Sequence, residues 1–139
     1  MPELKIESGV KEYNLNGKVT VLFNPTDTNF VEKYFNVFSS LDERQTRYGE
    51  AIAKAESNAA VFELARNMDE EIRTELNSLF STDICTPLLG EMSICALAGG
   101  LPIWANILLA MLDEMDSTFA QEKKATNPRL EKYIKKYKK

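Results

Sequence analysis

The stretch VKEYNLNGKVTVLFNPTDTNF, residues 10–30, decides the fold of the N-terminal part of the chain. Two β-prone runs flank Asn16-Gly17, and an Asn-Gly pair between such runs is a strong signal for an antiparallel β-hairpin. Pro25 stops the second run, because proline cannot donate a hydrogen bond to a sheet. Thr26 or Asp27 can then cap a helix. The sequence therefore predicts a hairpin that leads directly into a helix.

The register of this hairpin follows from its apolar residues. A two-residue turn would mix charged and apolar side chains on one face. A three-residue loop with Gly17 in the left-handed conformation avoids this mixture, and we expect it to pair Tyr13 with Val19. The same register pairs Lys11 with Val21. One apolar face then carries Tyr13, Val19, Val21 and Phe23.

A further short segment with strand character precedes the hairpin. Residues 3–7 alternate between charged and apolar side chains, and Ser8-Gly9 ends the run. Such alternation is typical of a half-buried strand. Residues 3–24 are thus predicted to form a β-hairpin or a three-stranded meander.

The region that follows, residues 26–123, has helical periodicity and is predicted to form a helical bundle. Ser39-Ser40 interrupts the apolar face of the first helix. Ser40 and Glu43 fit a capping box for a second, mostly polar helix that runs to about Glu56. With these breaks we expect five to six helices. The predicted fold class is α+β, mainly α, in a single domain that spans residues 1–139.

After Ser57-Asn58, a further helix carries an apolar seam of coiled-coil type. Its members are separated by steps of three and four residues. The seam residues are Val61, Ala65, Met68, Ile72, Leu76 and Leu79. Short seams are mostly internal to a domain, and binding of a helical partner is the alternative reading.

Residues 92–112 contain no charge, so a membrane span has to be considered. Gly99-Gly100 and Pro102 interrupt the run, its flanks are acidic, and no basic anchor lies close to either end. We therefore expect a buried core segment that breaks into two helices, the second of which is long. Trp104 and Leu108 lie on the apolar face of that second helix.

Charge divides the chain into two parts. Residues 1–121 carry nine basic and nineteen acidic side chains, a balance of −10, whereas residues 122–139 carry eight basic and two acidic ones, a balance of +6. Residues 127–139 are expected to form a basic C-terminal helix or tail. Lysines beside Tyr133 and Tyr137 could grip nucleic acid, but so short a basic segment on an acidic body argues against this as the main role.

Catalytic and metal-binding sets are missing from the sequence. There is no histidine, which removes the commonest general base and the commonest metal ligand. Cys85 and Cys95 are expected to be reduced and buried, and an apolar environment raises a thiol pKa. The acidic run Asp69-Glu70-Glu71 lacks the alternating oxygen ligands of a calcium loop. We therefore expect no enzymatic activity, no metal and no cofactor.

Residues 20–43, TVLFNPTDTNFVEKYFNVFSSLDE, resemble the small tail-assembly proteins of phages and prophages of Gram-positive bacteria. The features that carry the resemblance are the hairpin with its Asn-Gly turn and the segment FNPTDTNF, residues 23–30, which opens a helix. These proteins are similar to the tail assembly chaperones that are encoded just before the tape measure protein. The resemblance covers the N-terminal third of the chain, and the helical remainder agrees in size and character.

The resemblance implies a cytoplasmic protein, made during infection, that coats the long helical tape measure protein and delivers subunits of the tail tube. Such a chaperone needs exposed apolar helix surface rather than an active site. The candidate binding residues are the seam from Val61 to Leu79, together with Trp104 and Leu108. Self-association through apolar helix faces is also expected.

Two other functions stay open at this point. A holin would span the membrane with residues 92–112 and would use the lysines as an anchor, so it would stay with membranes on fractionation. A small nucleic-acid-binding regulator would use the basic tail, and its binding would weaken as salt is raised.

Overall fold

The computed structural model describes residues 1–125 together with Arg129, Lys132 and Lys136. Within this part the chain is α+β and mainly helical, as predicted, with an antiparallel hairpin near its N-terminus. The elements in chain order are β1 (Lys11–Leu15), β2 (Val19–Phe23), α1 (Thr28–Lys54), α2 (Asn58–Asn77), α3 (Cys85–Leu89), β3 (Leu97–Ala98), β4 (Leu101–Pro102) and α4 (Ile103–Lys124). The predicted basic helix of residues 127–139 falls mostly on residues outside this description.

The hairpin has the predicted loop but not the predicted pairs. Leu15 pairs with Val19, so a three-residue loop separates the strands, and Gly17 is left-handed with φ at 72°. Tyr13 pairs with Val21 rather than with Val19. The predicted pairs were wrong because Tyr13 opposite Val19 would leave five residues in the loop. A slip of two residues keeps every side chain on its face, so the predicted apolar face is still formed.

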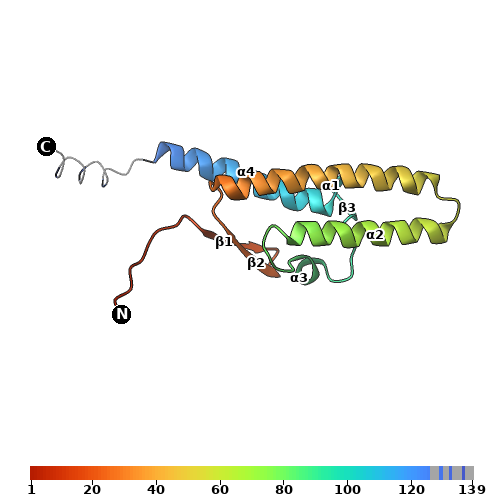
Figure 1. Ribbon diagram of the computed structural model, residues 1–139, viewed down its shortest axis with the longest axis horizontal. Coiled ribbons are helices and arrows are strands. Elements are labelled where there is room, and N and C mark those ends of the chain that lie inside the picture. Colours follow the sequence, from red (N-terminus) through yellow and green to blue (C-terminus); the bar gives the residue numbers. More distant parts are fainter. Residues whose placement is uncertain (126–128, 130–131, 133–135, 137–139) are drawn as a thin grey trace.

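The predicted third strand is absent from the described residues, because residues 3–7 pair with nothing. The chain turns sharply at Gly9, whose φ is +73°. Asn24 fixes this turn by donating from Nδ2 to the carbonyl oxygen of Ser8 at 2.9 Å. The N-terminal segment therefore leaves the body of the molecule instead of folding back onto the hairpin (Figure 1).

Helix α1 is a single helix of 27 residues, where two helices were expected. Asp27 caps its start by accepting a hydrogen bond from the backbone N–H of Asn29. Ser40 does not cap a second helix. Its hydroxyl donates to Glu75 Oε1 on α2 at 2.7 Å, so the serine is satisfied across the helix pair and α1 continues through it. This is one reason why the described part contains four helices rather than five to six.

The apolar block of residues 92–112 does break at Gly99-Gly100, although not into two helices. The short helix α3 ends at Leu89, and the glycines, both with positive φ, form the turn of a second small hairpin, β3–β4. Pro102 is the N-cap of α4. Of the described helices, none is long and apolar enough to cross a membrane.

The hydrophobic core lies where α1, α2, α4 and the β1–β2 hairpin meet. Phe23 stacks between Tyr13 and Phe30, with ring centroids 4.7 Å apart in both pairs. This stack joins the apolar face of the hairpin to α1. The side chains of the core that are fully enclosed include Tyr34, Leu41, Ile72, Leu76, Ile84, Ile94 and Leu108.

Figure 1 shows the arrangement of the helices. Helices α1 and α2 form a long antiparallel pair, and α4 lies against the N-terminal part of α1. The α1–α2 pair extends past the start of α4. Residues 42–71, which are all described, contain no buried residue, so this outer part of the helix pair is covered on fewer sides than the rest of the molecule.

Candidate protein-binding surfaces

The structure divides the eight candidate binding residues into two groups. Five of them are buried in the chain's own core: Ile72, Leu76, Leu79, Trp104 and Leu108. The other three, Val61, Ala65 and Met68, are half-buried and lie on the outer part of α2. In this conformation the seam is therefore internal at its C-terminal end and accessible at its N-terminal end.

Two polar contacts mark where α4 begins to cover α1. The indole Nε1 of Trp104 donates to Gln45 Oε1 at 2.7 Å. Further along, the hydroxyl of Tyr34 donates to the carbonyl oxygen of Leu108. The start of α4 thus lies beside Gln45, and the nine residues of α1 beyond Gln45 extend past it.

Apolar side chains continue on α1 and α2 beyond this point. Ala65 precedes Ile72 by seven residues, which is close to two full turns, so it lies on the side of α2 that faces the core. Ile52 follows Gln45 by the same interval on α1. Ile52 and Ala65 therefore continue the core-facing sides of α1 and α2 as an apolar stripe. Phe62 is adjacent to this stripe and is 61% exposed. We define the distal face as the apolar surface formed by Ile52, Val61, Phe62, Ala65 and Met68.

A polar network links α1 and α2 near the middle of the pair, where the buried core ends. Arg44 on α1 forms ion pairs with Glu71 at 3.2 Å and with Glu75 at 3.1 Å. The hydroxyl of Tyr48 donates to Glu71, and Ser40 donates to Glu75. The residues are spaced four apart on each helix, so they form one continuous ladder. The ladder adds polar contacts between α1 and α2 beside the apolar core.

The ladder predicts a small, pH-dependent effect of Tyr48→Phe. The hydrogen bond from Tyr48 lowers the pKa of Glu71 below its ordinary value of 4.5; partial burial opposes the shift and Arg44 adds to it. A lowered pKa contributes stability that is complete above about pH 4.5 and is lost as the pH falls through the folded value.

Because the Glu71 side chain is 45% exposed, solvent screens the interaction, and we expect Tyr48→Phe to cost about 0.5 kcal/mol at pH 7. The cost should be smaller at pH 3. Urea denaturation of the wild type and of Tyr48→Phe at both pH values would measure it. An equal cost at the two pH values would show that Glu71 has no part in it.

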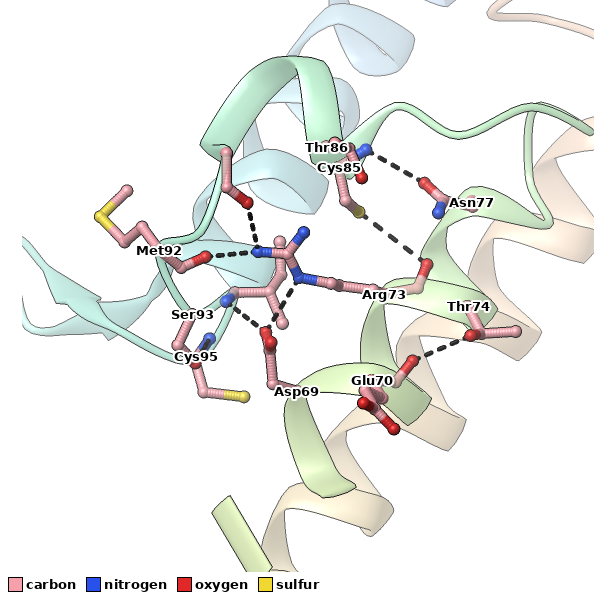
Figure 2. Close-up of polar contacts among 12 residues, drawn as sticks. Asp69, Glu70, Arg73, Thr74, Asn77, Cys85, Thr86, Met92, Ser93 and Cys95 are labelled. Carbon is pink, nitrogen blue, oxygen red and sulfur yellow. Dashed lines mark hydrogen bonds and ion pairs between the residues drawn. The ribbon is translucent and has the colours of Figure 1, made fainter. Parts of the chain in front are cut away.

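Asp69, the first residue of the acidic run, has a structural role (Figure 2). Asp69 Oδ1 accepts hydrogen bonds from the backbone N–H of Ile94 at 2.8 Å and from Arg73 Nε at 3.1 Å. Arg73 also donates to the carbonyl oxygens of Gly90 and Met92. These contacts hold the loop after α3 against α2. Within the described residues, no three acidic or cysteine side chains gather as a metal site would require.

The two cysteines are free thiols in the described structure, Cys85 buried and Cys95 half-buried. Burial raises the pKa of Cys85 to about 12 and that of Cys95 to about 11. A thiol with so high a pKa stays protonated at neutral pH and is a poor nucleophile.

A second surface, which the sequence did not suggest, is a groove of about 560 Å³ between the β1–β2 hairpin, α3 and α4. One side of α4 forms its floor, through Ile103, Asn106, Ile107, Ala110, Met111 and Glu114. The hairpin contributes Tyr13, Asn14, Leu15, Asn16, Lys18, Val21 and Phe23. We call this surface the hairpin groove. Its volume is in the range of ligand-binding clefts, and most of its lining is apolar.

In the comparisons with known proteins, no family model, no curated protein and no solved structure matches this chain. The resemblance of residues 20–43 to tail-assembly proteins therefore stays a prediction from the sequence. Two accessible apolar surfaces of the described part, the distal face and the hairpin groove, are the candidate binding sites.

Proposed function

We propose that this chain is a non-enzymatic phage tail assembly chaperone that binds the helical tape measure protein through the distal face. The observation that carries the proposal is the part of the α1–α2 pair beyond Gln45, where the inward-facing apolar stripe continues and α4 no longer covers it. An amphipathic helix laid against this stripe would occupy the position that α4 has further along the pair.

The exposure of Phe62 supports this site. A phenylalanine that is 61% exposed leaves apolar area in water, and exposed aromatic side chains are enriched at protein interfaces. Ala65 next to it is small, which lets the backbone of an added helix approach closely. A helical client would therefore gain from covering Phe62 and from packing closely against Ala65.

The net charge of the outer part of the α1–α2 pair suggests which side chains flank the apolar stripe of the client helix. Residues 42–71 hold eight acidic and four basic side chains, a balance of −4. Opposite charge at the rim of an interface speeds association and selects the partner. We therefore expect lysine or arginine beside the apolar stripe of the client helix.

The remaining parts of the proposal rest on the resemblance. Delivery of the major tail tube protein and a cytoplasmic location follow if this chain works like the tail assembly chaperones it resembles. These chaperones need no cofactor, and the proposal includes none. The alternative of a nucleic-acid-binding regulator depends on the basic tail, which lies mostly outside the described residues.

Phe62→Asp should strongly weaken client binding while leaving the fold intact. The change removes the exposed aromatic ring and adds a charge to the stripe, so we expect at least a tenfold loss of affinity for a coiled-coil fragment of the tape measure protein encoded in the same genome. Co-purification from cells that express both proteins, followed by titration calorimetry, would measure it.

The matched control is Leu22→Asp, because Leu22 is 62% exposed and lies on the hairpin, outside the distal face. Its affinity for the fragment should equal that of the wild type. If both variants bind the fragment normally, the distal face is not the client site. If both lose binding, the effect is a general one of added charge.

A further inference from the structure

The N-terminal segment combines strand character with exposed apolar side chains. Leu4 is 86% exposed and Ile6 is 84% exposed, and the two alternate with Glu3, Lys5 and Glu7. Leu4 and Ile6 would therefore share one face if residues 3–7 were extended. We call residues 3–7 the arm. A segment with this pattern is suited to the edge of a sheet that has one buried face.

The turn at Gly9 holds the arm away from its own hairpin. The carbonyl oxygen of Ser8 accepts a hydrogen bond from Asn24 Nδ2. A Cβ atom on Gly9 would lie 2.6 Å from Asn24 Nδ2, so the close approach at this turn requires glycine. In the described structure the arm consequently projects from the body, as Figure 1 shows.

The free edge of β1 lies along the hairpin groove. Tyr13, Asn14 and Leu15 are consecutive in β1 and all three line the groove, although their side chains alternate between the two faces of the sheet. From β2, only the inward-facing Val21 and Phe23 line it. Among the described residues, no strand other than β2 pairs with β1, so the β1 edge is open to an added strand.

We propose that the arm of a second copy of this chain pairs with the β1 edge as the third strand of the sheet and places Leu4 and Ile6 in the hairpin groove. Backbone hydrogen bonds would hold the arm, and the groove would accept its two apolar side chains. This self-association goes beyond the proposed chaperone function and does not depend on it, because the distal face has no part in it.

Charge complementarity supports a copy of the same chain as the occupant. With Leu4 and Ile6 facing the groove, Lys5 lies on the opposite face of the added strand. That is the face on which β1 carries Glu12, which is exposed between the inward-facing Lys11 and Tyr13. Lys5 and Glu12 are therefore able to pair across neighbouring strands, where opposite charges stabilise a sheet.

The oligomeric state of the full chain tests the proposal. We expect sedimentation equilibrium to give a dimer or a larger assembly for the wild type at micromolar concentration. The double variant Leu4→Asp/Ile6→Asp should be monomeric over the same range, with an unchanged circular dichroism spectrum, since both side chains are exposed. The control Phe119→Asp, at a 55% exposed position on α4 outside the hairpin groove, should associate like the wild type.

A cross-linking experiment tests the position of the arm. Under mild oxidation, a mixture of Lys5→Cys and Glu12→Cys chains should give a disulfide-linked pair at several times the yield of either variant alone. A monomeric wild type would overturn the proposal. So would an assembly that persists in Leu4→Asp/Ile6→Asp, or a mixture that cross-links no better than the separate variants.

Discussion

Replacing Ile72 with Asp is expected to unfold the protein. Ile72 is fully buried on the side of α2 that faces the core. Truncation of a buried isoleucine alone costs about 2–5 kcal/mol, and an unpaired carboxylate in an apolar site adds a further penalty. The sum is comparable to the whole stability of a domain, which is about 5–15 kcal/mol. Circular dichroism should show loss of the helical signal at 25 °C.

Phe62→Asp is the matched comparison for this change, because it introduces the same residue on the same helix at an exposed position. Its stability in urea should lie within about 0.5 kcal/mol of the wild type. If Ile72→Asp instead kept its helical content and lost only client binding, Ile72 would belong to the client interface and the core would have been assigned wrongly.

Trp104→Ala is expected to lower the free energy of unfolding by about 3–5 kcal/mol. Trp104 is 2% exposed at the start of α4, where its ring packs edge-on against Phe38 with centroids 6.0 Å apart. It is the only tryptophan in the chain, so its fluorescence reports on this site alone. Emission typical of a buried indole, shifting to longer wavelength on unfolding in urea, would confirm the placement.

A second variant separates the hydrogen bond of Trp104 from its burial. Gln45→Leu removes the acceptor of the indole N–H but keeps a side chain of similar size. An unsatisfied buried donor costs about 1–3 kcal/mol, so this variant should be less stable than the wild type yet more stable than Trp104→Ala. A loss below about 1 kcal/mol for Trp104→Ala would show that α4 does not close the core at this point.

Much of the fold could be predicted from local sequence signals. The Asn-Gly turn, the apolar face of the hairpin, the start of α2 after Ser57 and the course of α4 all follow from residues that are near one another in the chain. The left-handed conformation of Gly17 is one example, because a glycine adopts it without steric cost. Such signals are reliable where no distant residue competes with them.

The candidate binding surfaces could be predicted only in part. Periodicity places Ala65 and Ile72 on the same stripe of α2, but it cannot tell that one is half-buried and the other enclosed. That difference arises because α4 begins beside Gln45 and covers only part of the α1–α2 pair. The hairpin groove was not predicted at all, since its walls come from three segments far apart in the chain.

The sequence by itself determined the class of the fold, the hairpin and the positions at which α2 begins and α4 ends, because turn chemistry, capping and apolar periodicity act over a few residues. Only the tertiary structure decided that α1 runs unbroken through Ser40 and that residues 3–7 stay unpaired. Ser40 is suited to a helix N-cap by its local sequence, but its hydroxyl donates a hydrogen bond to Glu75 on α2, and α1 continues through it. The arm has the pattern of a strand, but Asn24 holds the turn before the hairpin and directs the arm outward. In both places a hydrogen bond between residues distant in sequence outweighs a local preference, because a local preference is worth no more than one such bond.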